Sequence, residues 1–154
     1  MKRLFQPLLA GLTMALAVGV ATPAAVQAQD AAPIVTYRVS VMNAFRTHMG
    51  GVRAALGDTA PIGHAEHHAV AFERMAQALA NVFPAGTAGP GSRALPAIWT
   101  DRNDFMNKVT AIQTATARLV TASRTGDSAQ IGTALQAVQG TCSGCHQTYR
   151  GPAN

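Results

Sequence analysis

The stretch GTCSGCHQTYR, residues 140–150, contains the only two cysteines of the chain. Cys142 and Cys145 are separated by two residues, and His146 follows directly. This Cys-x-x-Cys-His arrangement is the attachment signature of a c-type haem. Thiols three residues apart on a helix share one face and can add to the two vinyl groups of the porphyrin. The neighbouring imidazole can then bind the iron, so we expect one covalent haem c.

Three other uses of a Cys-x-x-Cys pair fit this sequence less well. A redox-active disulfide is typical of a βαβ pattern, which does not precede this motif. A zinc site would need further ligands, and the chain has no second pair of thiols. A structural disulfide across three residues would close a very short loop and would stabilise the fold little.

The N-terminal segment has the pattern of an export signal. Two basic residues precede an apolar run over residues 8–20, and Val26-Gln27-Ala28 offers small residues for cleavage. The run is shorter than the roughly 20 residues of a membrane-spanning helix, so we expect no stable membrane anchor. We interpret residues 1–28 as a secretory signal peptide and residues 29–154 as one domain. Covalent haem is attached outside the bacterial cytoplasm, so we expect the protein in the periplasm.

The net charge of the chain limits the kinds of molecule that it is expected to bind. Removing the predicted signal peptide takes the formal net charge from +5 to +3, because its only charged residues are Lys2 and Arg3. Without a run of basic residues, nucleic acid binding is not indicated. The charge supports only a weak preference for an acidic redox partner. We therefore expect redox proteins as electron donors and acceptors.

Four segments follow a helical period, and none alternates convincingly as a strand. We expect helices at about 35–56 and 64–81, a third that begins at 97–101 with Thr100 as its cap, and a fourth that begins at Asp127. A glycine- and proline-rich loop after Phe83 is the segment expected to wrap a cofactor edge. The other connections are short, which predicts an all-α fold, an antiparallel four-helix bundle.

Apolar stripes predict which residues face the core of this bundle. On the fourth helix, Cys142 and Cys145 continue the stripe, which would pack the covalently bound haem inside the bundle. Arg38 lies on the stripe of the first helix. The expected core positions are Val35, Met42, Phe45, Met49, Val52 and Leu56; then Ala71, Met75, Ala78, Leu79 and Val82; then Phe105, Val109, Ile112, Thr116 and Leu119; and finally Ile131, Leu135, Val138 and Tyr149.

Together these features resemble the class II c-type cytochromes, the cytochrome c′ family. Its C-terminal hallmark is met by Gly140, Cys142, Cys145, His146, Tyr149 and Arg150, and Phe83–Thr87, Pro96–Trp99 and Tyr37-Arg38 with Met42 are similar to its loop and helix starts. The resemblance implies that His146 is the fifth iron ligand and that both cysteines carry the haem. It places Arg150 on the proximal side of the haem and Arg38 near the propionates or the distal pocket. It also allows a homodimer, although no exposed stripe argues for one.

The two arginines have simpler interpretations as well. Arg150 could cap the C-terminus of its helix, where a cation is favoured. Arg38 could lie along the helix with its charged head in water.

Met42 decides between two functions. By resemblance, six-coordinate low-spin members bind iron through a methionine here, whereas five-coordinate high-spin members leave an open site for NO or CO. A thioether ligand favours reduced iron and suits electron transfer, although a methionine on an apolar stripe can also simply pack. We expect an exported monohaem electron carrier, not an enzyme, with iron bound by His146 and Met42. The alternative is a gas-binding protein with an open distal site.

The remaining histidines and the single tryptophan receive structural interpretations. His64, His67 and His68 do not follow the His-Glu-x-x-His spacing, so we interpret them as a solvated face rather than a metal site. His48 is interpreted in the same way. Trp99 is expected to pack at the start of the third helix.

Overall fold

A computed structural model of the chain describes residues 23–89 and 91–152. Its four long helices are α1 (Pro23–Leu56), α2 (His64–Gln77), α4 (Arg102–Ser123) and α5 (Ser128–Tyr149), with the short helices η1 (Leu79–Val82) and α3 (Ala97–Thr100) between α2 and α4. In this described part, strand-like pairing is limited to one antiparallel bridge between Ala94 and Arg150. The predicted all-α fold is confirmed.

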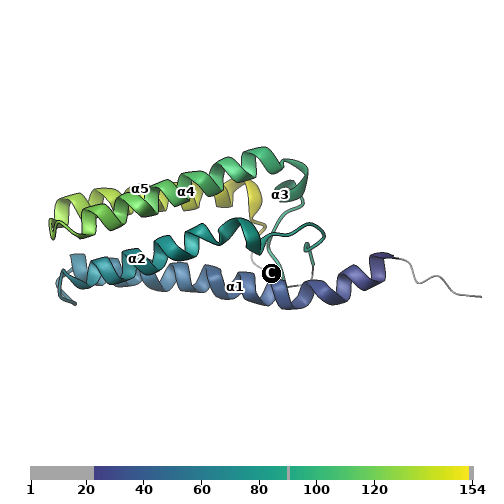
Figure 1. Cartoon of the computed structure of the whole chain (residues 1–154), viewed down its shortest axis with the longest axis horizontal. Coiled ribbons are helices and arrows are strands. Elements are labelled where there is room, and N and C mark those ends of the chain that lie inside the picture. Colours follow the sequence, from purple (N-terminus) through teal and green to yellow (C-terminus); the bar gives the residue numbers. More distant parts are fainter. Residues whose placement is uncertain (1–22, 90, 153–154) are drawn as a thin grey trace, which may run out of the picture.

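The long helices form a closed ring. α1 packs against α2, α2 against α4 and α4 against α5, while α5 also contacts α1. Successive helices run in opposite directions, and α3 lies at the end of the bundle where α5 finishes (Figure 1). Asp58 and Gly126, with φ of 58° and 70°, lie in the two short turns that reverse the chain. This arrangement is the predicted antiparallel four-helix bundle.

The predicted inner faces of the last two long helices are confirmed. On α4 and α5 the predicted apolar positions are buried, and both cysteines pack against the same core while remaining partly exposed. Three aromatic rings cross the bundle at the end of α5. The ring centroids of Phe83 and Phe105 are 5.1 Å apart, and those of Phe105 and Tyr149 are 5.3 Å apart, both edge to face. Such pairs add geometric specificity to apolar burial.

The predicted inner face of α2 was wrong in part. The helix expected at 64–81 ends at Gln77, and Leu79 and Val82 lie in η1, where they are buried as expected; Ala71, Met75 and Ala78 are only partly covered. The buried residues of the helix are Ala65, Ala69, Phe72 and Ala76. Small alanines recur around much of this helix, so its apolar period is ambiguous. Phe72 decides the orientation because its ring stacks on Phe45 at 4.9 Å between centroids.

Helix starts were predicted with mixed success. Asp127 caps α5, because its Oδ1 accepts hydrogen bonds from the backbone N–H groups of Ala129 and Gln130 at 2.8 and 3.1 Å. The predicted Thr100 cap was wrong, since Thr100 ends α3 and Asp101 precedes α4. A kink at Asp101, with φ of −116° and ψ of 57°, separates the two helices. The expected third helix is therefore two helices.

The first helix starts earlier than predicted. α1 begins at Pro23 rather than near residue 35. Alanines are frequent before residue 35, and alanine has the strongest helix propensity. Of the predicted signal peptide, residues 1–22 lie outside the described residues and residues 23–28 belong to α1, so cleavage after Ala28 stays a prediction. Among the described residues, no helix combines the length and apolarity that crossing a bilayer requires.

Candidate functional site

The Cys-x-x-Cys-His motif occupies the last two turns of α5. Cys142 and Cys145 are free thiols, partly buried, and both contact the hydrophobic core. They lie on the same side of the helix as the buried Val138 and Tyr149. The helix remains regular through the motif, so the spacing of the thiols is set by one continuous element.

Burial raises the pKa of both thiols. Desolvation is the largest cause at Cys142 and at Cys145, and the nearby carboxylate of Asp104 adds to the effect at Cys145, against the opposing charge of Lys108. The two sulfur atoms therefore stay protonated until they react. Partly buried, unpaired thiols facing the core are suited to bonding a large apolar group that enters between the helices.

His146 lies beside this pair on the exposed side of α5. Its pKa is lowered, first by desolvation from the surrounding protein and then by the positive charges of Arg150 and Arg93. A lowered pKa keeps the imidazole neutral at physiological pH. The neutral ring is the form that binds a metal, so the electrostatics favour His146 as an iron ligand.

Arg150 follows the last residue of α5, and the C-terminal segment after it is hydrogen-bonded to the long loop. The backbone N–H of Arg150 donates to the carbonyl of His146 at 3.2 Å, which makes Arg150 the C-cap residue. Arg93 then donates to the carbonyls of Gly151 and Pro152, at 2.6 and 3.0 Å. The backbone of Arg150 thus ends the helix, and the interpretation of its charged side chain as a cap stays a prediction. Its exposed side chain lowers the pKa of His146, which fits the proximal position that was predicted.

A partly buried hydrogen bond joins the end of α5 to α4. The hydroxyl of Tyr149 donates to Oδ2 of Asp104 at 2.7 Å, and Tyr149 is only 3% exposed. Burial first, and the neighbouring carboxylates second, raise the pKa of Tyr149 above its ordinary value. The pair fixes the end of α5 against α4 one turn beyond Cys145.

Arg38 is built into the opposite side of this end of the bundle. Its guanidinium donates to the carbonyls of Val82 and Thr87 at 2.8 and 3.2 Å, to Oγ1 of Thr87 at 2.6 Å and to Oγ of Ser92 at 2.9 Å. The group also lies 4.5 Å from the centroid of the Phe83 ring. The side chain is 4% exposed, so the alternative of a solvated head was wrong. Acceptors in the loop outweigh the loss of hydration.

Met42 lies one turn after Arg38 on α1. It is partly buried and packs against the core, between the buried Arg38 and Phe45. α1 contacts α5, the helix that carries His146. Met42 therefore has the inner-face position that was predicted for it. Its role as an iron ligand stays a prediction.

The long loop after Phe83 does not reverse the chain simply. It holds Arg38 through Thr87 and Ser92, and the indole N–H of Trp99 donates to the carbonyl of Pro84 at 2.8 Å. Trp99 packs at the start of α3 as predicted. Sequence reasoning missed Ser92, Arg93 and Asp104 as contributors to this region. No local pattern marks them, because each acts on a group at least 45 residues away in sequence.

The residues present fit a covalently attached haem. Two free thiols and a neutral imidazole converge on one end of the bundle, which is the donor set that a c-type haem uses. A Cβ added at Gly140 or Gly144 would have no neighbour within 4 Å, so the protein itself does not require glycine at either position. Cys142 and Cys145 would carry the haem, and His146 would bind its iron.

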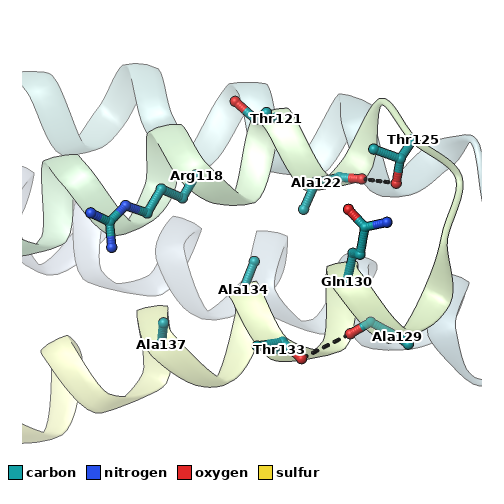
Figure 2. A pocket seen from close by; sticks show the side chains of 9 residues that line it. All are labelled: Arg118, Thr121, Ala122, Thr125, Ala129, Gln130, Thr133, Ala134 and Ala137. Carbon is teal, nitrogen blue, oxygen red and sulfur yellow. Dashed lines mark hydrogen bonds between the residues drawn. The ribbon is translucent and has the colours of Figure 1, made fainter.

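A groove on another face of the molecule is separate from this site. It lies between α4 and α5, has a volume of about 640 Å³ and is lined mainly by small side chains (Figure 2). None of its lining residues belongs to the Cys-x-x-Cys-His motif; they are Arg118, Thr121, Ala122, Thr125, Ala129, Gln130, Thr133, Ala134 and Ala137. Without a charged cluster or nucleophile it has no evident chemistry.

The other histidines behave partly as predicted. His64 and His67 are exposed, which confirms a solvated face for them. His68 is only partly exposed and contacts His48 across the α1–α2 interface, so the solvated interpretation was wrong for this pair. Within residues 23–89 and 91–152, no group of three or more histidine, cysteine or acidic side chains is placed to hold a metal ion.

Comparison with known proteins gives consistent matches over most of the chain. The family described as Cytochrome C' matches residues 33–150. A cytochrome c′ of Rhodospirillum rubrum is 37% identical over 131 residues, which cover 84% of this chain and 89% of that protein.

Solved structures agree with this result. The cytochrome c′ of Rubrivivax gelatinosus has a TM-score of 0.70 and 29% identity, covering 76% of this chain and 94% of that one. A nitric oxide complex of a cytochrome c prime variant from Alcaligenes xylosoxidans has a TM-score of 0.72 and 26% identity, covering 79% and 97%.

Proposed function

The chain belongs to the cytochrome c′ family of class II c-type cytochromes, which bind one covalent haem c, and on that premise we propose that it is an exported electron carrier. Haem c supplies a ferrous–ferric couple. Cys142 and Cys145 hold the haem to α5, and His146 binds the iron as a neutral imidazole. We propose that the protein transfers electrons without transforming a substrate.

The position of Met42 carries the proposal. Its side chain is partly buried on the inner face of α1, three residues before the buried Phe45 and one turn after Arg38. A methionine has several rotatable bonds, so its sulfur can reach an iron with little movement of the backbone. A thioether ligand favours ferrous iron and raises the potential, which suits electron transfer.

Arg38 supports the same side of the site by fixing the loop. Because its four hydrogen bonds span residues 82–92, the arginine holds that loop against α1 next to Met42. We expect a loop held in this way to fix the position of α1 around Met42. This favours a closed, six-coordinate iron.

Export, location and partners complete the proposal. Residues 1–28 have the pattern of a secretory signal peptide, and covalent haem attachment in bacteria requires export. We place the protein in the periplasm, where redox proteins would supply and accept its electrons and where a homodimer is compatible with the fold. N-terminal sequencing of the periplasmic protein should give Gln29 as the first residue; a chain that retains residues 1–28 would contradict the processing.

The decisive experiment compares Met42→Ala with Met49→Ala. Both methionines are partly buried on α1 and pack against the same core, seven residues apart. The wild-type ferrous protein should show sharp α and β bands of low-spin haem. Met42→Ala should keep the covalent haem but give a high-spin spectrum, faster CO binding and a lower potential. Met49→Ala should remain low-spin and lose only stability, about 2 kcal/mol.

A second function is favoured if the wild-type spectrum is already high-spin. A relative of similar fold is known as a nitric oxide complex, so an open sixth site for NO or CO is the alternative. In that case Met42 only packs, and prompt CO binding to the wild type would identify the gas-binding function. A Met42→Ala spectrum that stays low-spin would instead show that another residue is the sixth ligand.

A further inference from the structure

Two histidines outside the haem site face each other across the interface of α1 and α2. Nδ1 of His48 lies 3.2 Å from Nδ1 of His68, and the ring centroids are 5.5 Å apart with the planes inclined by 52°. Both side chains are partly buried. Since His146 serves the haem, these two and the exposed His64 and His67 are the remaining histidines of the chain.

Gly51 determines how the ring of His68 is held. A Cβ at Gly51 would overlap the face of the His68 ring, against Nε2, Cδ2 and Cε1. Only glycine therefore allows α1 to approach the ring so closely. With that face of the ring against α1, Nδ1 of His68 lies 3.2 Å from Nδ1 of His48. The close approach of the helices at Gly51 thus brings the two Nδ1 atoms together.

The separation of these nitrogens matches the edge of a metal coordination shell. Zinc binds imidazole nitrogen at about 2.0–2.1 Å in tetrahedral geometry, which places two ligand nitrogens about 3.3 Å apart. A direct N–H···N hydrogen bond at 3.2 Å is at the long end of the usual range. We propose that Nδ1 of His48 and Nδ1 of His68 bind a divalent transition-metal ion of the Zn²⁺, Ni²⁺ and Cu²⁺ class.

The donor set defines the ion and the kind of site. Neutral imidazole suits zinc, nickel and copper, whereas calcium and magnesium prefer oxygen ligands. No third histidine, cysteine or acidic group completes the set in the described chain, so the other positions would be open to water. The site is therefore partly open, unlike a closed four-ligand structural zinc site.

The consequence is a metal-dependent link between the first two helices. α1 and α2 are joined by the turn at residues 57–63. His48 lies on α1 and His68 on α2, so the two residues come from the two helices of one hairpin. An ion that binds the folded protein and not the unfolded chain raises the melting temperature with its concentration. His48 lies six residues after Met42 on α1, so substituting the two histidines leaves Met42 itself unchanged.

The chain itself offers a matched control. His64 and His67 lie on the same helix as His68, with ring centroids 5.8 Å apart, but both are exposed. This exposed pair shows how strongly two ordinary surface histidines on a helix bind the metal ion. Two double variants, His48→Gln with His68→Gln and His64→Gln with His67→Gln, therefore remove the same number of histidines from the two arrangements.

The test titrates Zn²⁺ into the haem-loaded protein by calorimetry after treatment with a chelator. We expect one Zn²⁺ per chain and a rise in melting temperature. The His48/His68 variant should bind Zn²⁺ at least about 10-fold more weakly and lose that rise, while the His64/His67 variant should match the wild type. The haem spectrum, measured in each case, should stay unchanged and shows that the fold is intact.

Three results would overturn the proposal. One is wild-type protein that does not bind Zn²⁺ at millimolar concentration. The second is loss of binding only in the His64/His67 variant, which would assign the ion to the surface pair. The third is equal binding by both double variants, which would place the ion elsewhere on the protein.

Discussion

On α5 the two cysteines and His146 lie within five consecutive residues of one helix, whereas on α1 Arg38 depends on partners between residues 82 and 92. The first arrangement needs only regular helix geometry. The second needs a loop to fold back over α1 before the arginine has any acceptor.

This difference separates attachment of the haem from control of its surroundings. The cysteines keep their spacing as long as α5 remains helical, so local change elsewhere leaves the attachment residues in place. Met42 and Arg38 are positioned by contacts between distant segments. Substitutions on the α1 side should therefore alter stability, spin state and potential while covalent haem is retained.

The largest effect is expected at the attachment residues. The double variant Cys142→Ala with Cys145→Ala removes both thiols, so it should lose all covalent haem. The measurement is a pyridine haemochrome assay on protein matured with the attachment machinery. Arg38→Ala, treated in the same way, should retain one covalent haem per chain. Equal loss of haem in the arginine variant would show that the two sides are not separable.

A smaller but substantial effect is expected for the stability of Arg38→Ala. The substitution leaves the buried carbonyls of Val82 and Thr87 without their donor, while Ser92 still accepts from the backbone N–H of Ala94. Unsatisfied buried groups cost about 1–3 kcal/mol each, so a total loss of about 3 kcal/mol is expected.

Urea denaturation followed by circular dichroism measures this loss. Arg46→Ala is the control, because Arg46 is exposed on the same helix. Its stability should change by less than about 0.5 kcal/mol. Equal unfolding midpoints for the two variants would mean that the loop, not the arginine, holds this side together.

The smallest expected effect is a pH-dependent change in stability that comes from Tyr149 on α5. Because the folded state raises the pKa of Tyr149, the unfolded chain loses the phenolic proton first. The stabilising contribution is therefore complete below about pH 10 and is lost as the pH rises further. Tyr149→Phe should be less stable than the wild type at pH 7 and should lose less stability between pH 9 and 11.

The exposed Tyr37 provides the control for this titration. Tyr37→Phe should follow the wild-type stability at every pH when melting temperatures are compared. A Tyr149→Phe profile parallel to the wild type would show that the bond to Asp104 does not couple stability to pH.

The sequence alone determined the attachment motif, the fold class and the inner faces of α4 and α5. These features depend on spacing within one helix, where bulky apolar residues such as Phe105, Ile112 and Leu135 mark the period clearly. The cap at Asp127 is equally local, since its partners are two and three residues away. Short-range geometry is encoded in the order of residues, so it can be read directly.

Only the tertiary structure decided the orientation of α2, the partners of Arg38 and the meeting of His48 with His68. An alanine-rich helix has several nearly equivalent faces, and the stacking of Phe72 on Phe45 selects one of them. The acceptors of Arg38 lie at least 44 residues away in sequence. Such contacts depend on how helices pack and how a long loop returns, and no local pattern of residues records either.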